Sequence, residues 1–176
     1  MHALQRRAGL SGEWRLQILI AQLDLKKAFD HIWHSAAIEA MEMQGVPLQA
    51  QAFMAKLWQQ STIKAKLGME TSTAVPLQRG LPQGAPESPL IFTIIVERLL
   101  RRLEASWRAR GFGFSLDELR LMSVSYADDI ILIGSSKAQL EQMLRDLVEA
   151  FGNVGLTFGA PKTHWTSMPA APLEKI

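Results

Sequence analysis

The clearest hydrophobic pattern in the chain is a set of short apolar runs that end at acidic residues. Residues 16–25 are rich in Ile and Leu and carry no charge until Asp24. A run of this length and composition predicts a buried strand, here one that ends in a carboxylate. Two further β-prone runs, 119–126 and 130–133, lie on either side of Ala127-Asp128-Asp129. That arrangement predicts a tight hairpin with two carboxylates at its tip.

Four other segments have apolar residues at helical spacing: 35–44, 47–60, 90–107 and 137–151. In the last of these the apolar positions recur every third or fourth residue, which is typical of one buried helix face. Gly45 is predicted to end the first of these helices, and Pro47 is predicted to begin the second. Ser88 and Pro89 are predicted to begin the third helix as its N-cap and first residue.

The segment between the second and third helices alternates in polarity and then turns glycine- and proline-rich. Residues 62–68 and 73–80 predict a pair of strands with Gly68 in their connection, and 80–89 predict a loop. Helices and strands therefore mix without strict alternation. This order predicts an α+β fold in which one antiparallel sheet carries helices packed on one face.

Composition narrows the class of protein. The chain has 176 residues, of which 48% are hydrophobic and 20% charged, so it is globular rather than disordered. It has no cysteine, which excludes a disulfide framework, a thiolate metal site and a cysteine nucleophile. No apolar run has the length of a membrane span, and the first residues lack the core of a signal peptide. We expect an intracellular protein of the nucleus or the cytoplasm that needs no membrane.

The charge balance is small, with 19 Lys and Arg against 17 Asp and Glu. Residues 98–110, however, hold five arginines and one glutamate. This helix segment is either a solvated face or a face that follows a phosphate backbone. His31 and His34 have no third ligand at a convincing spacing, so we interpret them as surface or capping residues.

The acidic residues suggest chemistry. If the strand that ends at Asp24 lies beside the hairpin of Asp128 and Asp129, three carboxylates meet at one edge of the sheet. Such a group needs a counter-charge, and hard divalent cations such as Mg²⁺ bind through oxygen ligands. Two such ions about 4 Å apart are a standard device for phosphoryl transfer, because they activate a hydroxyl and neutralise the leaving group.

Three segments resemble, in order, the core motifs of reverse transcriptases. They are Asp24-Leu-Lys-Lys-Ala-Phe-Asp30, Arg79-Gly-Leu-Pro-Gln-Gly-Ala-Pro-Glu-Ser-Pro89 and Tyr126-Ala-Asp-Asp129. A fourth motif corresponds to the stretch from Gly155-Leu156 to Lys162-Thr163, although the usual Asn before its Lys is absent. The forms of the first two motifs resemble those of non-LTR, LINE-type retrotransposons. The resemblance covers roughly residues 14–168.

The resemblance implies a polymerase palm and a role for each matching residue. Asp24, Asp128 and Asp129 would bind two Mg²⁺ ions, with Mn²⁺ as a possible substitute and the Leu25 carbonyl as an extra ligand. Phe29 would exclude a ribose 2′-hydroxyl. The remaining matches are Gln83 and Gly84 at the incoming nucleotide, Arg79 as a further substrate-binding residue, and Lys162 as the acid that protonates pyrophosphate.

The implied reaction is RNA-directed DNA synthesis, in which a dNTP is joined to a primer 3′-hydroxyl on an RNA or DNA template. We expect residues 1–176 to be a single, partial palm without the fingers and thumb of a parent polyprotein, and therefore a poor polymerase when isolated. A nucleotidyl cyclase or an RNA polymerase palm shares the paired carboxylates, but Ala28-Phe29 and Pro82-Gln83-Gly84 disfavour it. The alternative from another class is a catalytically incompetent retroelement fragment that at most binds nucleic acid.

Overall fold

The computed structural model describes residues 18–116, 118–159 and 164–168. The chain divides into two compact units. Of the described residues, the first contains those up to Lys26, those of Leu100–Ala150 and those from Phe158 onward. The second contains Lys27–Leu99 and Phe151–Thr157.

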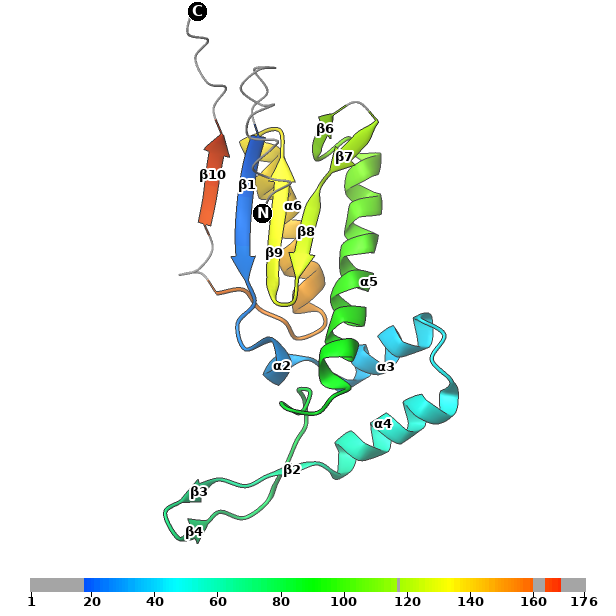
Figure 1. Ribbon diagram of the computed structural model, residues 1–176, viewed down its shortest axis with the longest axis vertical. Helices are drawn as coiled ribbons and strands as arrows, with labels where there is room; N and C mark the ends of the chain where they lie inside the picture. Colours follow the sequence, from blue (N-terminus) through cyan, green and yellow to red (C-terminus); the bar gives the residue numbers. More distant parts are fainter. Residues whose placement is uncertain (1–17, 117, 160–163, 169–176) are drawn as a thin grey trace, which may run out of the picture. The chain divides into compact units, whose positions relative to one another are not determined.

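The first unit is built on a four-stranded antiparallel sheet (Figure 1). Its strand order is β10 (His164–Met168), β1 (Ile18–Asp24), β9 (Asp129–Gly134) and β8 (Ser123–Tyr126). The predicted strand that ends at Asp24 is therefore confirmed, and it lies beside the predicted hairpin. Strand β10 was not predicted from the sequence.

The two faces of the sheet follow from the alternation of side chains along β1. Leu19, Ala21 and Leu23 are all buried, whereas Gln22 on the opposite face is exposed. The buried face packs against helix α6 (Lys137–Gly152), and a small cavity of about 130 Å³ between them is lined by Leu19, Ala21 and Leu140 among others. Figure 1 shows α6 behind the sheet. The predicted amphipathic helix and its packing on one sheet face are confirmed.

A two-stranded ribbon accounts for part of the other sheet face. Strands β6 (Phe114–Leu116) and β7 (Leu119–Leu121) pair with each other. Phe114 joins Ile18 and Ile133 in a small core against which Ile20, Leu121 and Ile131 also pack. The apolar end of this face is thus covered by β6 and β7, while Asp24 and Asp129 lie at the other end of the paired strands.

The second unit is mainly helical. It contains α2 (Ala28–His31), α3 (His34–Met43), α4 (Leu48–Gln60) and the first part of α5 (Ser88–Ala109), which continues into the first unit. The predicted helices 35–44, 47–60 and 90–107 correspond to α3, α4 and α5. Fully buried side chains form the core of this unit, among them Ile32, Ala37, Ala40, Trp58 and Ile95.

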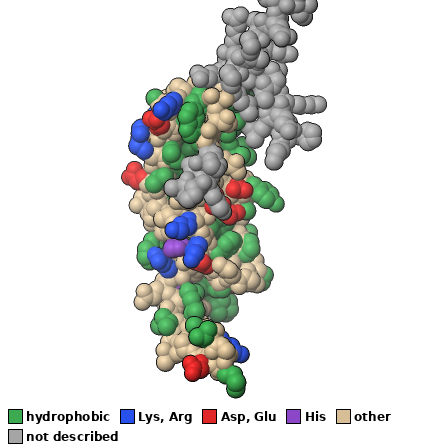
Figure 2. Space-filling model, turned by 90° about the vertical axis from the view of Figure 1, so that its left-hand side faces the viewer, with side chains coloured by type: hydrophobic (Ala, Val, Ile, Leu, Met, Phe, Trp, Pro, Cys, Tyr) green, Lys and Arg blue, Asp and Glu red, His purple; other side chains and the backbone are tan. Residues whose placement is uncertain are grey.

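The predicted pairing of residues 62–68 with 73–80 is confirmed only in part, because residues 66–67 pair with 70–71 and not with residues of the second predicted strand. Strand β2 (Thr62–Ile63) pairs with β5 (Val75–Pro76), and β3 (Lys66–Leu67) pairs with β4 (Glu70–Thr71). Between them the Ser72 hydroxyl accepts a hydrogen bond from the Ala65 N–H at 2.9 Å, so a side chain replaces a main-chain partner. Figure 2 shows hydrophobic side chains at the tip of this hairpin, at the lower end of the view; Leu67 and Met69 are 84% and 100% exposed.

The fold is thus α+β, as the order of predicted elements indicated. Within the described residues, no helix has the length and apolar character needed to cross a membrane.

Candidate active site

Two of the predicted carboxylates face each other across neighbouring strands. Asp24, the last residue of β1, pairs in register with Asp129, the first residue of β9. Residues directly opposite in an antiparallel pair have Cα atoms about 4.5–5.5 Å apart and side chains on the same sheet face. Two like charges in this position are unfavourable by themselves. A bound cation would remove that cost.

Asp128 occupies the turn that joins β8 to β9. Tyr126 pairs with Asp129, so Ala127 and Asp128 form a two-residue turn. The Leu25 N–H donates to the Asp128 carbonyl at 3.3 Å, which ties the end of β1 to this turn. All three predicted carboxylates therefore belong to one corner of the first unit, where Asp24 is half-buried and Asp128 and Asp129 are exposed.

Backbone strain accompanies this corner. Among the described non-glycine residues, Lys27 and Ala127 have a positive φ, of 47° and 52°. Each costs roughly 1–2 kcal/mol relative to an ordinary conformation. Lys27 follows the β1 carboxylate closely in sequence, and Ala127 directly precedes Asp128. Strain of this kind is often retained where a function requires the conformation.

The stretch assigned to the fourth motif also reaches Asp24. Phe158 forms an isolated antiparallel bridge with Leu25, and the Gly159 N–H donates to the Asp24 carbonyl at 3.0 Å. A Cβ atom on Gly159 would lie 3.7 Å from Asp24 Oδ2. The chain that leads toward Lys162 therefore runs beside the first carboxylate. Lys162 itself lies outside the described residues.

The donor chemistry of this corner suits a hard divalent cation. Carboxylate oxygens from two strands and a turn, with the Leu25 carbonyl nearby in sequence, are the ligands that Mg²⁺ and similar ions prefer. Over the described ranges, however, no three His, Cys, Asp or Glu side chains are grouped so that they could hold an ion as they stand. The corner therefore fits a cation in ligand type and backbone register, and coordination by all three carboxylates requires side-chain adjustment.

The second unit contains the other candidate residues, on α2 and on the loop between β5 and α5. The Gly80 N–H donates to the Ile32 carbonyl at 2.8 Å, and the Leu81 N–H donates to the Phe29 carbonyl at 2.7 Å. Gly80 has a φ of 94°, and a Cβ atom there would lie only 2.9 Å from the Asp30 carbonyl oxygen. Only glycine fits this close approach. The loop is thus joined to α2 along its backbone.

The half-buried Phe29 side chain, predicted to select the sugar, packs on helix α5. Its ring centroid lies 5.0 Å from that of Phe92 with an angle of 31° between the planes. Gly84 has a φ of 87°, and a Cβ atom built there would have no neighbour within 4 Å. The space in front of Gly84 is therefore open to a ligand, as the predicted close approach of a nucleotide requires.

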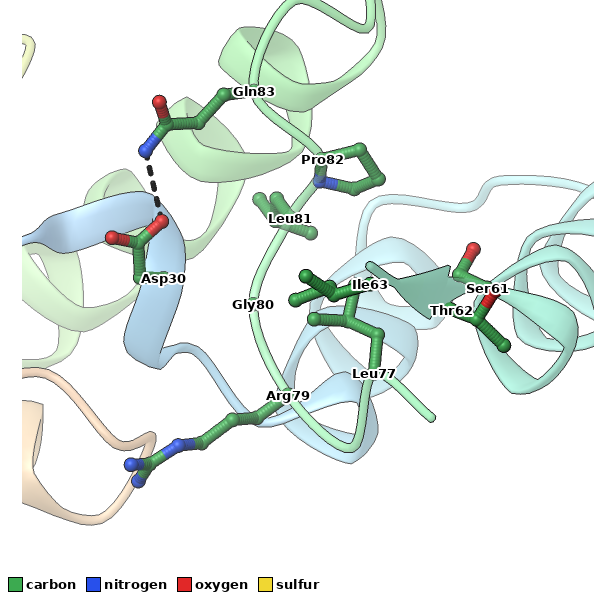
Figure 3. Close-up of a pocket in the computed structure, with 10 residues that line it drawn as sticks. All are labelled: Asp30, Ser61, Thr62, Ile63, Leu77, Arg79, Gly80, Leu81, Pro82 and Gln83. Carbon is green, nitrogen blue, oxygen red and sulfur yellow. Dashed lines mark hydrogen bonds between the residues drawn. The ribbon is translucent and has the colours of Figure 1, made fainter. Parts of the chain in front are cut away.

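A pocket of about 470 Å³ lies between the loop and the base of the hairpin (Figure 3). Arg79 and Gln83, two of the predicted substrate-binding residues, line it. The Gln83 side chain points toward Asp30 and donates to its Oδ1 at 2.8 Å, whereas Arg79 lies over the Trp33 ring at 5.4 Å. The pocket is lined by Asp30, Ser61, Thr62, Ile63, Leu77, Arg79, Gly80, Leu81, Pro82 and Gln83.

Two structural interpretations from the sequence need correction. His34 is not a surface or capping residue, because it stacks on Trp58 at 5.0 Å between ring centroids and its Nε2 hydrogen-bonds the Gly80 carbonyl at 2.8 Å. Ser88 is the first residue of α5 rather than its N-cap, because the helix begins at Ser88 and the Ile91 N–H donates to the Glu87 carbonyl at 3.0 Å. The buried Ser88 hydroxyl donates to the Pro82 carbonyl at 2.7 Å and so closes the preceding loop. Both side chains form hydrogen bonds with the backbone of the loop that carries Gln83.

The sequence reasoning assigned no role to Asp30, although this residue ends the first motif. Asp30 is an acidic residue directly after Phe29 and could have been noticed as a candidate for that reason. No spacing rule connects it with Gln83. Only the hydrogen bond in the folded chain does so.

Comparison with known proteins places these motifs in a family. A family model described as "Reverse transcriptase (RNA-dependent DNA polymerase)" matches residues 10–172. The Pol polyprotein of the R2 retrotransposable element from Nasonia vitripennis is 26% identical over 158 residues, which are 90% of this chain and 15% of that protein. A putative 115 kDa protein of element R1DM from Drosophila melanogaster is 31% identical over 150 residues, 80% of this chain and 13% of that protein.

Solved structures show the same fold at lower identity. Telomerase from Candida tropicalis, solved with a fragment of telomeric RNA, matches with a TM-score of 0.66 and 16% identity, over 94% of this chain and 28% of that one. The chain thus spans a small part of the length of these relatives. Together with the ordered motifs, the match to nearly the whole chain shows that it belongs to the reverse transcriptase (RNA-dependent DNA polymerase) family, among relatives from non-LTR retrotransposons such as R2, R1 and jockey.

Proposed function

We propose that this chain is the catalytic palm of an RNA-directed DNA polymerase of a non-LTR retroelement. It would transfer a nucleotide from a dNTP to a primer 3′-hydroxyl on an RNA or DNA template. The observation that carries the proposal is the register that sets Asp24 opposite Asp129, with Asp128 in the adjoining turn. In a chain of this family, that arrangement supports a catalytic carboxylate corner.

Reverse transcriptases use divalent metal ions, and we propose two Mg²⁺ ions here, with Mn²⁺ as a substitute. Asp24, Asp128 and Asp129 would hold them, with the Leu25 carbonyl as an additional ligand. When bound, such ions lower the pKa of the attacking hydroxyl and neutralise charge on the leaving pyrophosphate. The strained turn at Ala127 keeps the Asp128 backbone tied to the end of β1, so little reorganisation of the main chain is needed.

The residues of the second unit would handle the nucleotide. The Phe29 ring would lie against the sugar where a ribose carries its 2′-hydroxyl, and its packing on Phe92 limits how far it can retreat. The open space at Gly84 suits a close approach of backbone to nucleotide. Arg79 would add positive charge near the phosphates, and Lys162 would protonate the pyrophosphate as it leaves.

The chain covers 15% and 22% of the length of two R2 relatives. We infer that further segments of a polyprotein help to hold the template, the primer and the dNTP. Holding the hydroxyl and the α-phosphate at about 3–3.5 Å contributes much of the rate of such a reaction. We therefore expect extension by the 176-residue chain to be weak, and stronger in the full open reading frame that contains it.

The test is extension of a labelled primer on RNA and DNA templates with Mg²⁺ or Mn²⁺. It compares the 176-residue chain with the protein encoded by the full open reading frame. Asp128→Asn should lower the rate on the order of a thousandfold, which is a loss of about 4 kcal/mol of transition-state stabilisation. Glu118→Gln is the matched control, because Glu118 is also an exposed acid in a turn of the first unit and should leave the rate unchanged.

The outcomes separate the candidate functions. Extension that depends on Asp128 supports the polymerase. Robust Asp128-dependent extension by the 176-residue chain alone would contradict the expectation that this chain is a weak polymerase. Binding of nucleic acid without extension in either protein would overturn the enzyme and favour an inactive retroelement fragment.

A further inference from the structure

Gln83 is held by one specific partner within the second unit. Its Nε2 donates to Asp30 Oδ1 at 2.8 Å, across a wide sequence separation (Figure 3). Both side chains are exposed, so neither is fixed by burial. Without this bond, the Gln83 amide would sample several rotamers.

The backbones that carry the two side chains are also joined. The Leu81 N–H donates to the Phe29 carbonyl and the Gly80 N–H to the Ile32 carbonyl, at 2.7 and 2.8 Å, so main-chain bonds lie on either side of Asp30. Gly80 could not approach the Asp30 carbonyl so closely if it carried a side chain. The distance between Asp30 and Gln83 is therefore set by the fold rather than by chance contact of two flexible groups.

The identity of the partner fixes which way the amide faces. An ionised carboxylate only accepts hydrogen bonds, so the NH₂ group and not the carbonyl of Gln83 must face Asp30. The carbonyl Oε1 is then directed away from Asp30 as an acceptor. The chemistry of Asp30 therefore leaves one orientation of the amide.

This orientation decides which part of a nucleotide the Gln83 carbonyl oxygen can meet. Phosphate oxygens are acceptors and carry negative charge, so the outward Oε1 and the neighbouring Asp30 carboxylate both disfavour them. A sugar hydroxyl is a donor and suits Oε1. A dNTP has one sugar hydroxyl, at the 3′ position.

We propose that Asp30 is a positioning residue, which anchors the Gln83 NH₂ so that Oε1 accepts a hydrogen bond from the 3′-hydroxyl of the incoming dNTP. This proposal rests on the polymerase function proposed above. It assigns Asp30 a part in nucleotide selection without contact to the reacting atoms.

The first test needs no catalysis. In ¹H–¹⁵N spectra of the chain, the side-chain NH₂ signals of Gln83, assigned by their loss in Gln83→Ala, should be separated from those of free glutamines. Asp30→Ala should move them to the positions of free glutamines. Asp30→Asn, whose side-chain carbonyl still accepts, should keep them near the original positions. Signals that are the same in Asp30→Ala as in the unaltered chain would overturn the anchoring.

The second test measures selection in the full open reading frame, as the ratio of kcat/KM for a dNTP to that for the 2′,3′-dideoxynucleotide. Asp30→Ala should reduce this ratio about tenfold, and Asp30→Asn should restore most of it. Glu87→Ala removes an acid from the same loop and should leave the ratio unchanged. An unchanged ratio in an active Asp30→Ala protein would overturn the proposal. If no protein extends a primer, the polymerase function fails, and the spectra still decide whether Asp30 anchors Gln83.

Discussion

Individual side chains in this chain take their roles from the backbone that presents them. Phe29 shows this, because its helix has only four residues and its ring is placed by Phe92 of α5 and by the main-chain bond from Leu81. The sequence marks Phe29 through the motif it belongs to. The structure adds that the ring has a supporting surface, which a residue that excludes a hydroxyl by shape requires.

Phe29→Ala should therefore raise ribonucleotide incorporation relative to deoxynucleotide incorporation by at least about tenfold, because the space for a 2′-hydroxyl is opened. The measurement is kcat/KM for an rNTP and the matching dNTP. Phe53→Ala, which removes an exposed ring from the same unit, should not change the ratio. If Phe29→Ala also left it unchanged, Phe29 would be a packing residue only.

At the next level, the loop after β5 and helix α2 act as one piece because of Gly80. Its positive φ lets the chain turn, and its missing side chain lets two main-chain hydrogen bonds form with residues of the first motif. His34 and Ser88 add bonds from side chains at the Gly80 carbonyl and the Pro82 carbonyl. Motifs far apart in the sequence are held together by these bonds.

Gly80→Ala should lower the free energy of unfolding by more than Gly84→Ala does. Both positions have positive φ, so each substitution costs roughly 1–2 kcal/mol of backbone strain. Only Gly80→Ala adds a 2.9 Å clash with a carbonyl oxygen, because the space at Gly84 is open. Urea unfolding of the two variants measures the difference. Equal losses of stability would show that the loop does not depend on its close approach to α2.

For the protein as a whole, positive and negative side chains nearly balance, so the electrostatic contributions to stability come from individual ion pairs rather than from a large net charge. Of the five arginines in residues 98–110, Arg98 pairs with Glu39 and Arg110 pairs with Asp146. Trp107 and Gln142 also donate to Asp146, at 2.8 Å each. Burial of Asp146 raises its pKa, but the hydrogen bonds from Arg110, Gln142 and Trp107 and the charge of Arg110 outweigh this and lower the pKa below its ordinary value of 3.8.

A lowered pKa in the folded state means that the ionised form stabilises the fold above about pH 4, and that this contribution is lost as the pH falls through the lower, folded-state value. Asp146→Asn should thus reduce the free energy of unfolding by about 1–3 kcal/mol at pH 7 and by progressively less below pH 4. Urea unfolding between pH 3 and 7 measures this. Glu141→Gln, in an exposed pair with Lys137, should have little effect at any pH. A loss of stability in Asp146→Asn that did not vary with pH would contradict the assignment.

Local patterns in the sequence were sufficient for much of the fold. The run that ends at Asp24, the hairpin around Asp128 and the helix beginning near Lys137 have strong periodicity, and the structure has all three. Local periodicity did not require the first strand to lie beside the hairpin. That arrangement was the condition for the three carboxylates to meet, and the structure has it. The motifs indicated the family because their residue types and their spacing can be read directly from the chain.

Other features depended on contacts between distant residues. Strand β10 was not predicted, and in the structure it pairs with the edge of β1. The split hairpin at Ser72, the stacking of His34 on Trp58 and the bond from Gln83 to Asp30 each join residues that no periodicity relates. The strongly periodic elements and the candidate catalytic residues could be predicted from the sequence, because both depend on residue types and spacings along the chain. The tertiary structure decided which polar groups meet, because hydrogen bonds between segments depend on a register and a distance that exist only once the chain has packed.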